Sequence, residues 1–95
     1  MICVTVKAIM QVAALLGREQ IIQVPKGSCI ADVFDALEEK YGQPFTNLIY
    51  INEKKDLNSL FIVMLNGRSI TLGDGLNSLV NDGDELLFFP PIGGG

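Results

Sequence analysis

The stretch that decides the fold is Asp82-Gly83-Asp84-Glu85-Leu86-Leu87-Phe88-Phe89-Pro90-Pro91-Ile92-Gly93-Gly94-Gly95, at the end of the sequence. Asp82-Gly83 is typical of a tight turn, because glycine tolerates positive φ and aspartate hydrogen-bonds the local backbone. The run from Glu85 to Phe89 is short, apolar and aromatic, which predicts a buried strand. Pro90 and Pro91 lack N–H donors, so sheet pairing should stop at Phe89.

We expect residues 1–89 to form the domain and residues 90–95 to form an extended, flexible tail, which reaches about 20 Å from Phe89. Gly93, Gly94 and Gly95 have no side chains to pack, and a backbone without Cβ atoms fits a narrow channel. The distinctive chemical group is the α-carboxylate of Gly95, with a typical pKa of about 3.5. A carboxylate is a poor electrophile, so it must be activated before a nucleophile attacks it. The alternative is a frayed end without function.

Composition indicates a single globular domain of 95 residues, of which 48% are hydrophobic. The net charge of −4 disfavours nucleic-acid and anionic-membrane binding, which need basic patches, and suits docking onto a basic partner. Met1 leads directly into a strand pattern, and no apolar run reaches membrane-spanning length. We therefore expect a cytoplasmic protein that is monomeric when isolated.

The two cysteines, Cys3 and Cys29, have no metal-ligand spacing, and histidine is absent. A metal site or a Cys–His catalytic pair is therefore not expected. Both thiols are interpreted as small buried hydrophobic residues. The alternative for Cys29 is a thiol whose pKa is lowered by a helix N-terminus.

Residue patterns divide the rest of the chain into regular elements. Alternation predicts a strand over 2–8, and a second strand over 21–24 pairs with it in antiparallel fashion. Between them, apolar residues at 12, 15 and 16 fit a helical turn or a compact apolar loop. Helical spacing predicts the main helix over 29–41, with Ser28 as its N-cap and Gly42 as its stop.

The segment 43–59 is mixed in character, and its charged part is interpreted as a solvated loop. Residues 60–65 are apolar on both faces, which predicts a central strand. Asn66-Gly67 is typical of a hairpin turn; it leads into a short return strand at 68–70 and a loop over 71–81.

These elements predict an α+β fold, in which one helix covers a face of a mixed four- or five-stranded sheet. If the first and last strands lie side by side and parallel, the tail leaves the sheet beside residues 9–11.

With these elements in place, the chain resembles the ubiquitin-like β-grasp sulfur carriers of the MoaD/ThiS family, and most of all the small subunit of molybdopterin synthase (the MoaD type). The most specific match runs from Asp82-Gly83-Asp84-Glu85 through Phe88-Phe89-Pro90-Pro91, followed by two residues and Gly94-Gly95. Weaker matches are Leu16-Gly17, Ser28 and Leu65-Asn66-Gly67.

The resemblance implies that a ubiquitin-activating-like adenylating enzyme (MoeB/ThiF type) uses ATP to convert the Gly95 carboxylate into an acyl-adenylate. A sulfur donor then displaces AMP and leaves a thiocarboxylate. The tail delivers the sulfur inside the large synthase subunit (MoaE type), as part of molybdenum or tungsten cofactor synthesis. The chain itself would be a carrier subunit, not catalytic alone, with no bound cofactor or metal.

The resemblance also implies roles for residues near the end. Gly95 carries the reactive group, and Gly94 and Gly93 give access to the channel. The partner-facing residues are Phe89, Pro90, Pro91 and Ile92.

Four departures from the family pattern concern the partner. Lys7 and Ser69 are polar where the docking patch is usually apolar, the segment 43–59 is long, and Gly93 makes a triple glycine. Two other functions fit the same tail: a sulfur carrier for thiazole, a sulfur amino acid or thiolated tRNA, and a protein modifier joined to lysines through Gly95.

Overall fold

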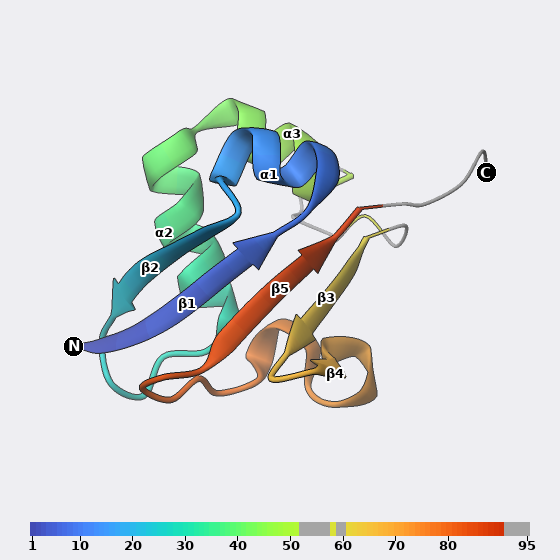
Figure 1. Ribbon diagram of the computed structural model, residues 1–95. Helices are drawn as coiled ribbons and strands as arrows, with labels where there is room; N and C mark the ends of the chain where they lie inside the picture. Colours follow the sequence, from blue (N-terminus) through green and yellow to red (C-terminus); the bar gives the residue numbers. More distant parts are fainter. Residues whose placement is uncertain (52–57, 59–60, 91–95) are drawn as a thin grey trace.

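A computed structural model of the chain describes residues 1–51, 58 and 61–90. Five strands form one sheet, and the α-helices lie behind it on one face (Figure 1). The elements follow one another as β1 (Ile2–Ala8), α1 (Met10–Leu16), β2 (Glu19–Val24), α2 (Ile30–Tyr41), α3 (Gln43–Ile49), β3 (Ile62–Leu65), β4 (Arg68–Ser69), η1 (Ile70–Leu72), η2 (Gly75–Asn77) and β5 (Glu85–Phe89).

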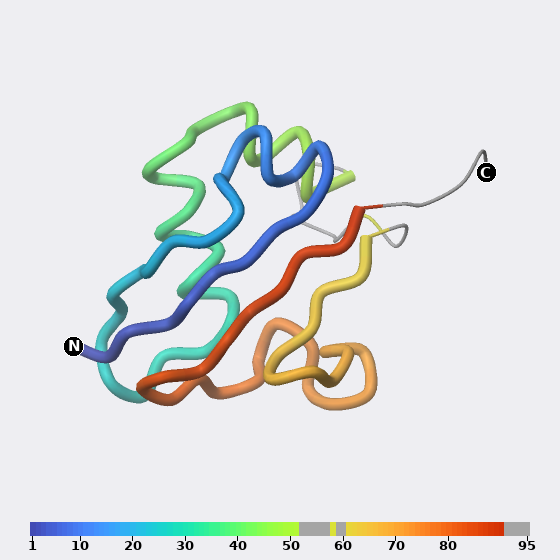
Figure 2. Tube along the Cα trace, in the orientation of Figure 1, coloured from blue at the N-terminus to red at the C-terminus, as the bar shows by residue number. Residues whose placement is uncertain are grey.

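The sheet has the strand order β2-β1-β5-β3-β4, with the first and last strands at its centre. β1 pairs with β5 in parallel, from Thr5 opposite Glu85 to Ala8 opposite Phe88. The pairs β1–β2 and β5–β3 are antiparallel, and the trace in Figure 2 shows β1 and β5 running side by side. This arrangement confirms the mixed β-grasp sheet and the parallel central pair that the sequence predicts.

Hydrogen bonds at the start of β5 fix its register against β1. The Cys3 amide donates to Asp82 Oδ1 at 2.7 Å, and the Gly83 amide donates back to the Cys3 carbonyl at 2.8 Å. Two residues further along β1, the Thr5 amide donates to the Asp84 carbonyl at 2.8 Å. Gly83 has a φ of 89°, which glycine adopts without steric cost.

Hydrogen bonds of Asn66 also join the β3–β4 turn to the start of β5. Asn66 Nδ2 donates to Asp84 Oδ1 at 3.0 Å, and the Glu85 amide donates to Asn66 Oδ1 at 2.9 Å. Asn66 and Gly67 both have positive φ, 52° and 84°, as the predicted hairpin turn requires. A few polar groups near the start of β5 therefore align β1, β5 and the hairpin.

The core lies between the sheet and the helices. In β1 and β5 alternate residues are buried, which is the burial pattern of strands covered on one face. Four residues of α2 are buried against them: Ile30, Val33, Phe34 and Leu37. The Phe34 ring lies 5.3 Å from the Phe88 ring and 5.9 Å from the Phe45 ring, centroid to centroid.

Two predictions about the helices need correction. The main helix begins with Cys29 as its N-cap instead of Ser28, because Asp32 Oδ2 accepts the Cys29 amide at 2.8 Å and the Cys29 thiol at 3.4 Å. The segment 43–59, interpreted as mixed, opens with helix α3, whose first turn contains Pro44, a position where proline is tolerated.

The interpretation of both cysteines as buried hydrophobic residues also needs correction. Neither Cys3 nor Cys29 is buried, because both side chains are partly exposed.

The prediction of a central strand at 60–65 was also wrong in part. β3 spans Ile62–Leu65, and only Val63 is buried. Its outer neighbour β4 pairs with it only at Met64 and Leu65, so β3 lies near the sheet edge and its apolar residues stay partly exposed. Leu60 lies outside the described residues.

Replacement of Asp82 by alanine tests whether the hydrogen bond from Cys3 to Asp82 stabilises the pairing of β5 with β1. We expect Asp82→Ala to lower the free energy of unfolding by about 1–2 kcal/mol, because the Cys3 amide loses a charged acceptor. Asp82→Asn keeps an acceptor oxygen and should lose less. Urea unfolding measures the change, with Asp74→Ala as the control, because the Asp74 side chain makes no cap hydrogen bond. Equal losses of unfolding free energy at the two positions would contradict a stabilising role of this hydrogen bond.

The helix cap predicts an acid-dependent contribution to stability. The hydrogen bond from the Cys29 amide, and then that from its thiol, lower the pKa of Asp32 below its ordinary value. A lowered folded-state pKa stabilises the fold above the unfolded pKa, and this contribution disappears as pH falls through the folded pKa. We expect Asp32→Asn to lower the urea midpoint at neutral pH and to leave it little changed near pH 2. Glu39→Gln, on the same helix, is the control.

Candidate functional site

The last described residues hold the end of β5 to the core. Phe88 and Pro90 are both less than 2% exposed, whereas Phe89 is half-buried. Phe89 pairs with Ile62 across the sheet, and strand pairing ends there, as the two prolines predict. The predicted site residues Pro91, Ile92, Gly93, Gly94 and Gly95 lie outside the described residues.

Beside this exit, four side chains form what we call the tail-side apolar patch: Ile62, Met64, Leu87 and Phe89. They share the sheet face opposite the core, because each alternates with a buried or core-packed neighbour. Ile62 pairs with Phe89 and Met64 with Leu87, so the four residues adjoin one another. Ile62 is 51% exposed, and the other three are half-buried. The patch is an apolar surface next to the point where the tail leaves the sheet.

The two polar departures border this patch. Lys7 is opposite Leu87 on one side, and Ser69 is opposite Met64 on the other. Sequence reasoning placed Phe89 and Pro90 at the partner surface and did not find Ile62, Met64 or Leu87. Pro90 is buried instead, because it packs into the core. Their common face follows from the register of β3 against β5, which no local pattern reveals.

An ionic row crosses the outer face next to the patch; we call it the Glu19–Lys7–Glu85 row. Lys7 Nζ lies 2.9 Å from Glu85 Oε1 and 3.7 Å from Glu19 Oε1. The hydrogen bond and charge of Glu85 come first among the causes that raise the pKa of Lys7, and Glu19 adds to them. Lys7 therefore stays protonated at neutral pH.

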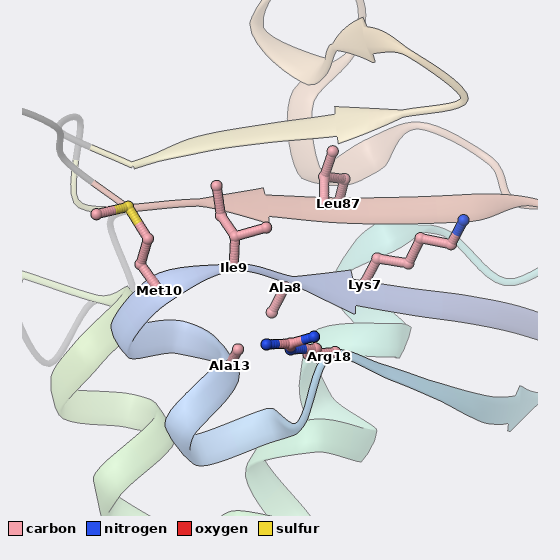
Figure 3. Close-up of a pocket in the computed structure, with 7 residues that line it drawn as sticks. All are labelled: Lys7, Ala8, Ile9, Met10, Ala13, Arg18 and Leu87. Carbon is pink, nitrogen blue, oxygen red and sulfur yellow. The ribbon is translucent and has the colours of Figure 1, made fainter.

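An open hollow of about 430 Å³ lies at the corner between β1 and α1. The residues lining it are Lys7, Ala8, Ile9, Met10, Ala13, Arg18 and Leu87 (Figure 3). Because Ala8 is opposite Phe88, the turn at Ile9 and Met10 lies beside the end of β5, as predicted for the tail exit. Met10 is 59% exposed and has a φ of 55°, unusual for a residue other than glycine.

The described residues around the exit are suited to docking. The charged side chains lining the hollow are those of Lys7 and Arg18, and its lining includes no carboxylate, thiol or imidazole. Within residues 1–51, 58 and 61–90, no three Asp, Glu, Cys or His side chains could together hold a metal ion. In the same part of the chain, no helix combines the length and hydropathy needed to cross a membrane.

Comparison with known proteins gives one family and several relatives. Residues 6–95 match the ThiS family. Small archaeal modifier protein 3 from Haloferax volcanii is 32% identical over 82 residues, which cover 85% of this chain and 86% of that protein.

Two solved structures extend the comparison. Small archaeal modifier protein 1 from Methanosarcina acetivorans has a TM-score of 0.81 at 27% identity, over 100% of this chain and 98% of that one. A chain of the Amycolatopsis orientalis BexX/CysO complex has a TM-score of 0.74 at 25% identity, over 97% and 99%. The chain therefore belongs to the ThiS family of ubiquitin-like β-grasp proteins, which includes sulfur carriers and modifiers.

Proposed function

We propose that this protein is the sulfur carrier of a molybdopterin synthase-type complex. The observation that carries the proposal is the end of β5: the strand stops at Phe89, beside the partly exposed tail-side apolar patch, and the sequence continues as Pro90-Pro91-Ile92-Gly93-Gly94-Gly95. Membership of the ThiS family supports carrier chemistry at the final glycine. The aromatic and proline residues before the glycines favour the molybdopterin type.

The proposed chemistry takes place at the Gly95 carboxyl carbon. An adenylating enzyme joins a carboxylate oxygen to the α-phosphate of ATP and releases pyrophosphate. Sulfide-level sulfur (HS⁻) then attacks the carbonyl carbon, AMP leaves with the oxygen that joined it to that carbon, and a thiocarboxylate remains. ATP binds the partner enzyme and not this chain.

This protein contributes position and recognition to that chemistry. Buried Phe88 and Pro90 hold the last strand to the core, so a partner that covers the tail-side apolar patch lies beside the point from which the tail continues. Phe89 belongs to both the strand and the patch. We propose that the adenylating enzyme and the large synthase subunit use this patch in turn, with Pro91 and Ile92 adding contacts beyond it.

The names of the relatives support a second candidate function. Small archaeal modifier proteins 1 and 3 resemble this chain along most of its length, and a modifier would use the same activated Gly95 to form an isopeptide with a target lysine. Denaturing blots for conjugates of higher mass separate the two functions. A carrier yields a thiocarboxylate without conjugates.

Incubation with ATP, the adenylating enzyme and a sulfur source should add the mass of one sulfur-for-oxygen exchange at Gly95. Intact-protein mass spectrometry measures it. Removal of Gly94 and Gly95 should abolish the exchange and leave the urea midpoint unchanged, because glycines add no side-chain packing. A carboxylate that never changes mass with its cognate enzyme would contradict the proposal.

Replacement of a patch residue tests the docking surface. We expect Leu87→Gln to lower kcat/KM for adenylation about tenfold or more, because a central apolar contact is lost from the interface. Ile21→Gln is the matched control: Ile21 is 63% exposed on β2, away from the patch. Circular dichroism and urea unfolding establish that both variants are folded. Equal losses of kcat/KM for the two variants would show that the patch is not part of the interface.

A further inference from the structure

The outer face of the sheet changes character along the strand direction. The tail-side apolar patch occupies the end where β5 finishes, and Glu85, at the start of β5, belongs to the Glu19–Lys7–Glu85 row. Phe89 is four positions after Glu85, which corresponds to about 13 Å along a strand. A partner seated on the patch therefore covers or borders the row.

The row carries a net charge of −1, because one ammonium (+1) lies between two carboxylates (−2). The side chains are 38% exposed for Lys7, 63% for Glu19 and 53% for Glu85. Each carboxylate has about four acceptor sites, so both retain capacity for a further donor.

The Lys7 side chain extends away from Ile9 and Met10, toward the start of β5 (Figure 3). Its ammonium is thereby drawn away from the tail exit, and its methylene stem remains beside Leu87, its partner in the register. Among the described residues, Glu19 and Glu85 form their ion pairs with Lys7 and not with Arg18. Arg18 is therefore not a member of the row.

The net negative charge of the row affects which partner surface can dock over it. An apolar partner surface over the row would desolvate three charges and leave one negative charge without a counterion, which is costly. A partner with an arginine or lysine at that place would supply the missing cation and extra hydrogen bonds. A surface that repels one class of partner and attracts another confers specificity.

We propose that the Glu19–Lys7–Glu85 row determines which adenylating enzyme this chain accepts, by binding an arginine or lysine of that enzyme about 13 Å from the tail exit. The proposal rests on the proposed function, because it assumes an adenylating partner on the patch. It adds the chemistry of that partner: an apolar surface around the channel for the tail and a cationic side chain beside it.

Binding of the full-length chain to the ThiF-type adenylating enzyme of its own genome tests the proposal. Isothermal titration at several salt concentrations gives Kd for the wild type, for the double variant Glu19→Gln/Glu85→Gln, and for Glu39→Gln. Glu39 is an exposed acid of α2, on the helical side. We expect the double variant to bind about tenfold more weakly at low salt, with a flatter salt dependence, and Glu39→Gln to bind like the wild type.

Lys7→Met separates a cationic partner from an apolar one. Without the internal ammonium the row carries −2, so a partner cation should bind more tightly and with a steeper salt dependence. Weaker binding of Lys7→Met would overturn the proposal, since an apolar partner would then face two unpaired carboxylates. Urea unfolding of each variant establishes that it is folded.

The specificity proposal and the proposed function are contradicted by different results. If the wild type is adenylated but the double variant binds like the wild type, or no more weakly than Glu39→Gln, the specificity proposal is wrong and the proposed function stands. If the cognate enzyme neither binds nor adenylates the wild type, the proposed function fails, and the specificity proposal fails with it.

Discussion

The parallel pairing of β1 with β5 is the constraint on which the rest of the structure depends. It joins the two ends of the described chain at the centre of the sheet, and a parallel pair needs a long crossover between its strands. Everything from α1 to η2 forms that connection. The pairing between Cys3 and the Asp82-Gly83 turn sets its register, with Asn66 adding the hairpin to the same junction.

Register also divides the two phenylalanines before the tail. Phe88 enters the aromatic cluster around Phe34, and Phe89 joins Ile62 on the outer face. A slip of one residue would exchange these faces, because side chains alternate along a strand. The same hydrogen bonds that stabilise the sheet therefore also place these apolar side chains together on the outer face, beside the end of β5.

The outer face combines two kinds of interaction with different reach. Apolar contact acts only when surfaces meet, whereas charge acts over about a Debye length, roughly 10 Å at moderate salt. In this sheet the apolar part lies near the end of β5, and the ionic row lies toward its start. In the proposed complex, charge would act on an approaching partner before apolar contact forms.

The sequence by itself determined the regular elements with strong periodicity: β1, the main helix, the hairpin turn at Asn66-Gly67 and the end of β5 at Phe89. These depend on local patterns and on the φ preferences of glycine and proline. It also identified the tail as the candidate reactive part, because glycine, proline and the carboxyl group have chemistry that needs no neighbours to be recognised.

Tertiary structure decided what depends on distant partners. Helix α3, the position of β3 near the sheet edge and the patch of Ile62, Met64, Leu87 and Phe89 follow from packing and register. The ionic row likewise combines residues from β1, β2 and β5. Side chains far apart in the chain acquire a common face only when their strands pair, so a local pattern contains each residue but not its neighbours across the sheet.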